Sequence, residues 1–134
     1  MKLIKKISHI SLFTNDLNKV RSFYIDILKL KIAHKFLNDQ NDLYGLFINA
    51  GEGTFIEFFK TDKEIINTNK NHFCFEVSDI NKIKENIQKS MKISIPIKRG
   101  KTDNILQFMI KDFENNSIEF HQYDNKSKLQ YTDE

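Results

Sequence analysis

Two histidines and two glutamates recur at matched places in two halves of the chain, and together they could hold a metal ion. The four residues are His9, Glu57, His72 and Glu119. Each histidine is followed seven positions later by Asp, and the run Asp, Leu/Ile, Asn, Lys, Val/Ile then closes both segments, residues 8–20 and 71–83. Each glutamate lies in an Ile-Glu-Phe triplet, 48 residues after the first histidine and 47 after the second. An internal repeat of this kind predicts two copies of one structural unit.

Two imidazoles and two carboxylates form a suitable ligand set for a divalent first-row metal ion, with Zn, Ni, Co and Fe as the expected ions. Four protein ligands that leave room for one or two waters are typical of a catalytic metal site. Such an ion polarises a substrate oxygen and lowers the pKa of bound water from about 15.7 towards roughly 7. A single histidine or glutamate in a strand is more often an ordinary polar residue. The recurrence in register favours the metal site, because a carboxylate buried on a shared face is costly unless something pairs with it.

In the first half, the hydrophobic pattern predicts the order strand, helix, strand, strand, strand. The first strand covers residues 7–14, where side chains of two faces alternate. Asn15 and Asp16 then offer an N-cap for an amphipathic helix that runs to about Leu28. The further strands are predicted at residues 31–36, 43–49 and 54–60.

The second half predicts the same order. A strand at residues 71–78 precedes a helix that Asp79 caps. A strand follows at residues 93–97, where Pro96 indicates an edge or a bulge. The last two strands are predicted at residues 106–110 and 117–123. The expected divisions are a first module at 1–60, a linker at 61–71, a second module at 72–124 and a flexible tail at 125–134.

Each module is expected to form a four-stranded sheet with its helix on one face. The histidine and the glutamate fall on the other face, because they alternate with the side chains that best pack the helix, most clearly Phe73, Phe75 and Val77. The predicted fold is therefore α+β, with two tandem βαβββ modules pairing into an open, curved eight-stranded mixed sheet around a metal cleft. The modules could pair within one chain or swap across a dimer, and a homodimer is expected.

Length and composition exclude several classes of protein. The 134 residues suffice for one domain, or for two half-size modules that share a core. The net charge is only +3 and lysines alternate with acidic residues, so no nucleic-acid-binding surface is expected. No apolar run is long enough to span a membrane, and residues 1–6 lack the apolar core of a signal peptide. The single cysteine, Cys74, excludes an internal disulfide and fits a reducing compartment, so a cytoplasmic protein is expected.

Further polar side chains share the faces of the candidate ligands. His121 follows Glu119 by two residues, and it could be a fifth polar group in the cleft, a proton shuttle, a partner that orients a ligand, or a histidine at the rim. Cys74 and Ser11 each lie two residues after a candidate histidine. Cys74 has no basic neighbour in the sequence that would activate its thiol, and a cysteine of this kind is usually a small packing residue.

Three phenylalanines and two arginines complete the candidates for substrate binding. Phe55 and Phe59, with Phe13, fall on the face of the cleft and could form an apolar wall of a binding pocket. Arg21 and Arg99 are the only arginines, and each could bind a substrate carboxylate or simply lie on the surface. The sequence therefore identifies no clear clamp for a substrate carboxylate.

At these residues the sequence resembles the vicinal oxygen chelate superfamily, the glyoxalase/bleomycin-resistance/dioxygenase group, over about residues 5–124. Residues 22–28 resemble the family's helix ending F-Y-x-x-x-L-G, and residues 118–120 resemble its I-E-L strand. The order His, Glu, His, Glu is closest to that of glyoxalase I, whose corresponding residues are metal ligands. Two turns depart from the family pattern: D-P-D-G is DFEN at residues 112–115, and Lys29 replaces the glycine that ends the first helix.

The resemblance implies a metal-dependent lyase or isomerase for methylglyoxal detoxification. Such an enzyme converts the hemithioacetal of methylglyoxal and a thiol, such as glutathione, to a lactoyl thioester, and its Zn, Ni or Co ion stabilises the enediolate. By this analogy Glu119 is the expected base for proton transfer between adjacent carbons, and Glu57 is its partner.

Other functions of the same fold remain open. A binding protein could sequester a toxic small molecule without metal, as the bleomycin-resistance members do, although the intact His/Glu set argues against it. A thiol transferase, like those that open fosfomycin, or an epimerase would keep the metal and change the substrate. A ring-cleaving dioxygenase usually has a longer chain and a set of only two His and one Glu.

Overall fold

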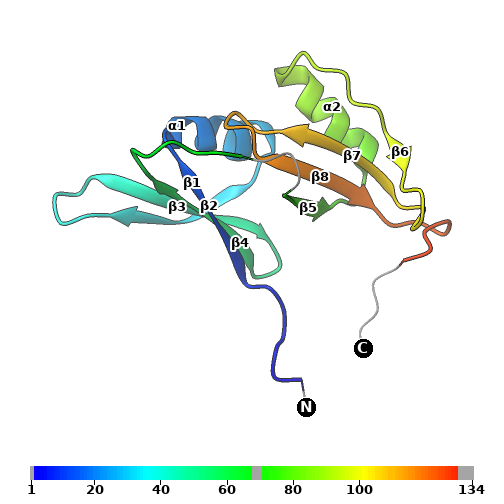
Figure 1. Cartoon of the computed structure of the whole chain (residues 1–134), viewed down its shortest axis with the longest axis horizontal. Helices are drawn as coiled ribbons and strands as arrows, with labels where there is room; N and C mark the ends of the chain where they lie inside the picture. The colour runs from blue at the N-terminus through cyan, green and yellow to red at the C-terminus, as the bar shows by residue number, and fades with distance from the viewer. Residues whose placement is uncertain (1, 68–70, 130–134) are drawn as a thin grey trace. The chain divides into compact units, whose positions relative to one another are not determined.

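The chain divides into two units, Met1–Ile66 and Asn67–Glu134, each built from helix and strand (Figure 1). The computed structural model describes residues 2–67 and 71–129. The boundary between the units falls inside the linker predicted at residues 61–71. Within the described residues, no helix combines the length and the apolar character needed to cross a membrane.

The first unit has the order β1, α1, η1, β2, β3, β4. The bounds are His9–Thr14 for β1, Leu17–Val20 for α1, Arg21–Ile27 for η1, Lys31–Leu37 for β2, Leu43–Gly51 for β3 and Thr54–Lys60 for β4. The strands form one sheet in the order β1-β4-β3-β2. β1 runs parallel to β4, and the other neighbours are antiparallel. The first and last strands of the unit therefore lie side by side.

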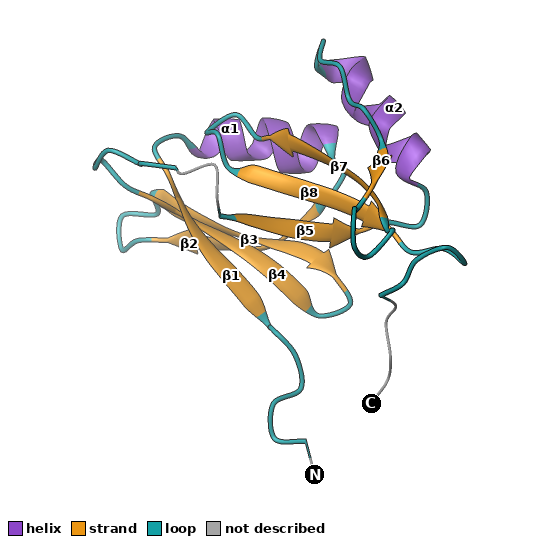
Figure 2. Ribbon diagram, turned by 45° about the vertical axis from the view of Figure 1, so that its right-hand side comes forward, coloured by secondary structure: helices purple, strands orange, loops and turns teal. Residues whose placement is uncertain are grey.

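The second unit repeats this arrangement. The bounds are His72–Glu76 for β5, Ile80–Ser90 for α2, Lys98–Arg99 for β6, Leu106–Lys111 for β7 and Ser117–Gln122 for β8. The sheet order is β5-β8-β7-β6, with β5 parallel to β8, and α2 lies across one face of this sheet (Figure 2). The prediction of two tandem βαβββ modules in an α+β fold is confirmed, and the strands of the described residues form two open, mixed sheets of four.

The helix starts follow the predicted caps, and the first helix ends in wide turns. The Asp16 carboxylate accepts a hydrogen bond from the backbone N–H of Asn18, and that of Asp79 accepts one from Lys82. η1 is a π-helix that continues α1, so the helix predicted from the amphipathic pattern is present with a wider second half. It stops where Lys29 takes a left-handed conformation with φ of 62°, the position at which glycine would be favoured.

Alternate strand residues form the core under the helices. In β4, Ile56 and Phe58 are buried, whereas Phe55, Glu57 and Phe59 are half-buried on the opposite face. The last strand of the second unit, β8, repeats this pattern around its own glutamate. The predicted division into a helix face and an open face that carries the glutamates is therefore confirmed in both units.

The prediction of a strand at residues 93–97 is wrong. These residues form no ladder, and the edge strand is the two-residue β6 that follows them. Pro96 lacks the backbone N–H that a ladder needs, which explains the delayed start. Ile95 is nevertheless buried, so this segment contributes to the core through its side chain rather than through strand pairing.

Part of the predicted flexible tail, residues 125–134, is held by hydrogen bonds. The backbone N–H of Lys128 donates to the carbonyl of Asp103 at 2.7 Å, and the side chain of Ser127 is buried against Asp124. Residues 130–134 lie outside the described residues, as do residues 68–70 of the predicted linker.

Candidate metal centre

The first unit places His9 beside Glu57 on the open face of its sheet. His9 lies on the edge strand β1 and Glu57 on the adjacent parallel strand β4, where the ladder partner of Glu57 is Ser11. The Nε2 atom of His9 is 3.4 Å from Oε1 of Glu57. The histidine side chain is 46% exposed and the glutamate side chain 16%, so the carboxylate is largely sheltered while the imidazole is open to solvent.

The second unit reproduces the same pair. His72 lies on β5, Glu119 on β8, and the ladder partner of Glu119 is Cys74. Nε2 of His72 is 3.2 Å from Oε2 of Glu119, with side-chain exposures of 42% and 17%. Two separate parts of the chain thus build one local geometry, an open imidazole next to a sheltered carboxylate.

Within residues 2–67 and 71–129, neither glutamate has a permanent cation as partner. In the described part of the chain, no lysine or arginine forms an ion pair with Glu57 or Glu119. The neighbouring imidazole supplies charge only when it is protonated. A sheltered carboxylate without a fixed cation is better compensated by a divalent ion that also takes the imidazole nitrogen as a ligand. The donor set of each pair therefore fits such a metal.

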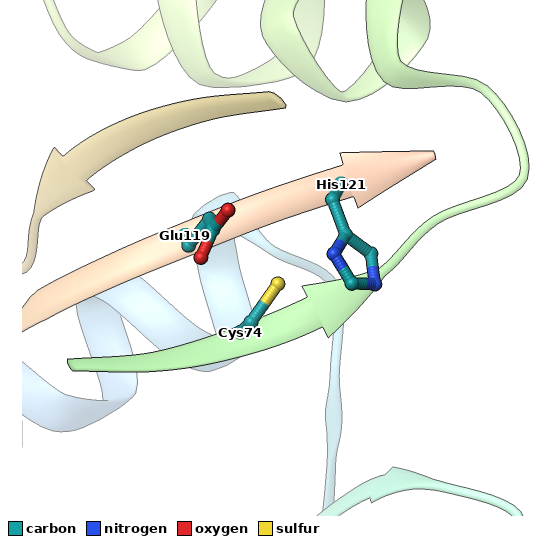
Figure 3. Close-up of side chains that lie close together, drawn as sticks. All are labelled: Cys74, Glu119 and His121. Atoms are coloured by element: carbon teal, nitrogen blue, oxygen red, sulfur yellow. The ribbon is translucent and has the colours of Figure 1, made fainter. Parts of the chain in front are cut away.

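The second unit contains a further group of donors around Glu119. The ligating atoms of Cys74, Glu119 and His121 all lie within 4.8 Å of one another, and Figure 3 shows these side chains gathered on β5 and β8. The sequence predicted that they share a face. It could not predict the cross-strand register, in which Cys74 lies directly opposite Glu119.

The electrostatic environment of this group is negative. Burial of the thiol, followed by the charges of Glu119 and Glu76, raises the pKa of Cys74 from 9.0 to about 12, although the residue as a whole is exposed. Burial and the charge of Glu76 also raise the pKa of Tyr123, whose ring packs 4.7 Å from that of His121. A cation at this place would be attracted by the carboxylates, and the metal-free thiol is not activated, as the sequence indicated.

The open face of the first unit carries an aromatic surface. Phe55 stacks on Phe47 with ring centroids 4.4 Å apart, and Phe59 packs 5.0 Å from Phe36. Phe55 and Phe59 share the face of Glu57, and their role as the wall of a pocket stays a prediction. Phe36 and Phe47 were missed, because β2 and β3 had to be aligned with β4 before their side chains could be assigned to this face.

Arg99 is engaged in a structural contact. Its guanidinium donates two hydrogen bonds to the carboxylate of Asp124, at 3.1 and 2.6 Å, and one to the carbonyl of Asn104. The guanidinium holds the pKa of Asp124 well below its usual range. Arg99 thus ties the segment after β8 to the loop before β7. It is not placed as a free clamp for a substrate carboxylate.

The family model of the Glyoxalase/Bleomycin resistance protein/Dioxygenase superfamily matches residues 6–120. The chain belongs to this superfamily. The match spans both βαβββ units and both His–Glu pairs. No curated protein sequence matches the chain.

Solved structures of this superfamily have the same fold and differ in what they do. Lactoylglutathione lyase from Agrobacterium tumefaciens is 20% identical, with a TM-score of 0.68 over 90% of this chain and 96% of that chain. The fosfomycin resistance protein FosX from Listeria monocytogenes is 22% identical, with a TM-score of 0.70 over 95% and 100%. TnmS3, an antibiotic binding protein from Streptomyces sp. CB03234, is 14% identical, with a TM-score of 0.70 over 92% and 100%. A mutant of FosX has also been solved as a complex with Mn(II). The superfamily therefore includes enzymes and binding proteins, and the fold alone does not select between them.

Proposed function

We propose that this protein is a metal-dependent isomerase of the glyoxalase I type, which converts the hemithioacetal of methylglyoxal and a thiol to a lactoyl thioester. The duplicated His–Glu pair carries the proposal. The proposed metal ligands are His9 and Glu57 in the first unit and His72 and Glu119 in the second. Support comes from the matching distances of 3.4 and 3.2 Å and from the sheltered carboxylates, which have no lysine or arginine partner among the described residues.

The expected ion is Ni, Zn, Co or Fe, because imidazole and carboxylate donors together suit these ions. When bound, the ion would supply Lewis-acid polarisation of the substrate oxygens. The protein side chains would position the substrate and move the proton. Each imidazole would orient its neighbouring carboxylate, and each sheet would hold its own pair on strands rather than on loops.

Glu119 would transfer the proton between the two adjacent carbons of the substrate, with Glu57 as the second catalytic carboxylate. Both side chains are less than one-fifth exposed, which limits competition from water at the carboxylate. Each lies on the strand next to the edge of its sheet, held by neighbours on both sides. This placement supports the proposed role of general base, which requires a carboxylate held within reach of one defined proton.

The first test measures metal content and turnover in the same sample. Metal-free protein is reloaded with Ni²⁺ or Zn²⁺, and thioester formation from methylglyoxal and glutathione is followed by absorbance. We expect the reloaded protein to retain bound metal and to show metal-dependent turnover. If no ion binds under any loading condition, the proposal is wrong. A bound ion without turnover would support the metal site and would indicate that the substrate contains another thiol or is a different chelating molecule.

The second test asks whether Glu119, rather than another carboxylate of the same sheet, acts as the base. Glu119→Gln preserves shape and removes the proton acceptor, and should lower kcat by about 10²–10⁴-fold. Glu76→Gln is the matched control, because Glu76 is an exposed carboxylate on the same face of the same sheet and is the ladder neighbour of His121. Equal turnover in wild type and Glu119→Gln would remove Glu119 from the role of base.

A second candidate function is the binding of an apolar small molecule. The aromatic surface around Phe47 and Phe55 favours it, because stacked rings on an open sheet face can take a flat ligand. The engagement of Arg99 by Asp124 also weakens the case for glutathione as the thiol. Tight binding of flat aromatic compounds by metal-free protein, without turnover of any hemithioacetal, would favour this candidate. A thiol transferase or epimerase would instead need the metal. A homodimer and a cytoplasmic location remain predictions from the sequence.

A further inference from the structure

We infer that the second unit binds a Zn²⁺ ion by itself, through Cys74, Glu119 and His121. This site goes beyond the proposed function, because two of its three ligands are absent from the proposed set of four. It also needs atoms from one unit only. Either site could therefore exist without the other, although they share one carboxylate.

The sheet register assembles the three donors. β5 and β8 are parallel neighbours in which Cys74 lies opposite Glu119 and Glu76 lies opposite His121. Glu119 and His121 are two residues apart on one strand, so their side chains project from the same face. The three ligating atoms are within 4.8 Å of one another before any ion is present.

The movement that the three donor atoms need in order to bind one ion is small. Zn–S and Zn–N bonds of roughly 2.0–2.3 Å in tetrahedral geometry place ligand atoms about 3.5 Å apart. The donors must therefore approach by about 1 Å, which rotation of side chains can supply. Cys74 is exposed and His121 is half-buried, so an ion can reach both from solvent.

The donor chemistry selects the ion. Thiolate and imidazole favour Zn²⁺ and Co²⁺, whereas Mg²⁺, Ca²⁺ and Mn²⁺ prefer carboxylate, carbonyl and water oxygens. Binding forms a bond between the ion and Sγ of Cys74 and releases the thiol proton to solvent. Glu119 supplies an oxygen and one negative charge, so the thiolate and carboxylate together neutralise the ion. Three protein ligands leave a fourth position for water.

The first unit provides an internal control. The residues at the repeat positions of Cys74 and His121 are Ser11 and Phe59, which flank Glu57 in the same register. A serine hydroxyl and a phenyl ring are not zinc ligands of the usual set. Among the described residues, the group of three clustered donors occurs in the second unit and not at the matched place in the first. The extra donors are therefore not a requirement of the shared fold.

The test is a Co²⁺ titration of the metal-free full-length protein, read by the near-ultraviolet charge-transfer absorption of a Co–thiolate bond. We expect a band that saturates at one ion per chain and disappears when Zn²⁺ is added. The variants Cys74→Ser and His121→Phe introduce the residues that the first unit tolerates at these positions. The first should abolish the band. The second should weaken Co²⁺ binding at least about tenfold, since loss of an outer partner alone typically costs 10–100-fold.

His9→Ala separates this site from the proposed catalytic site. It removes a ligand of the four-residue set and should keep the thiolate band, even if turnover is lost. A band that is missing in wild type at saturating Co²⁺ would overturn the inference. So would a band of unchanged affinity in both His121→Phe and Glu119→Gln, because Cys74 would then bind the ion without its neighbours.

Discussion

The thiol of Cys74 should react slowly with alkylating agents in the metal-free protein. Burial is the largest cause of its raised pKa, and the charges of Glu119 and Glu76 come next. The thiolate is the reactive form of cysteine, so an environment that disfavours negative charge slows the reaction. The reference is an unstructured peptide of residues 71–78, in which the same cysteine is free of Glu119 and of the sheet.

The pKa shift of Cys74 sets an upper limit for the slowing of alkylation. At pH 8, a thiol with a pKa of 9.0 is about 9% thiolate, and one with a pKa of about 12 is roughly 0.01% thiolate, a ratio of about 900. The more basic thiolate is also the better nucleophile. With a Brønsted coefficient of about 0.45, three pKa units make each thiolate roughly 20-fold more reactive, which offsets part of the lower thiolate fraction. The net slowing is then about 40-fold. Because Cys74 is exposed, water screens the carboxylates, and the measured slowing should lie between a few-fold and this limit.

The assay is the rate of alkylation by iodoacetamide, an uncharged reagent, in the presence of a chelator. The rate in the protein should keep rising with pH beyond pH 10, whereas the rate in the peptide should level off near pH 10, about one unit above its thiol pKa. Glu119→Gln removes the largest charge contribution and should accelerate the reaction in the folded protein. A protein that reacts as fast as the peptide at pH 8, or whose rate levels off at the same pH, would refute this account of the site.

Three further predictions concern stability. Phe58→Ala should lower the free energy of unfolding by about 3–5 kcal/mol in urea titrations, because Phe58 is 1% exposed, whereas Phe13→Ala, at a ring that is 60% exposed, should change it by less than about 1 kcal/mol. Asp79→Ala should cost about 1 kcal/mol through loss of the N-cap of α2, and an unchanged urea midpoint would contradict that role. Arg99→Gln should lower Tm most near neutral pH. The pKa of Asp124 is lowered in the folded protein, so the ion pair stabilises the fold above the carboxyl pKa of the unfolded chain and loses that effect as pH falls. The difference in Tm between wild type and Arg99→Gln should therefore narrow below about pH 4. A difference that stays constant with pH would contradict the pairing.

The repeat and the alternation of side chains were sufficient to predict the architecture. Matched segments around His9 and His72 predicted two βαβββ units, and period-two alternation placed each histidine on the face away from the helix. Asp16 and Asp79 predicted the helix starts, because an N-cap is a local interaction between a side chain and the next turn. These features depend on neighbours within a few residues, and a sequence displays such neighbours directly.

The sites themselves depend on which strands are adjacent. Shared parity put His72 and Cys74 on one face of their strand, but only the parallel pairing of β5 with β8 brings Nε2 of His72 to 3.2 Å from Oε2 of Glu119, 47 residues away in the chain. The same applies to Arg99, whose partner Asp124 is 25 residues away. The strand predicted at residues 93–97 failed for a related reason, because an apolar run with Pro96 can bury its side chains without joining a ladder. Residue types and local periodicity determined what chemistry the chain could offer. Long-range backbone hydrogen bonding in the two sheets decided which of those groups meet.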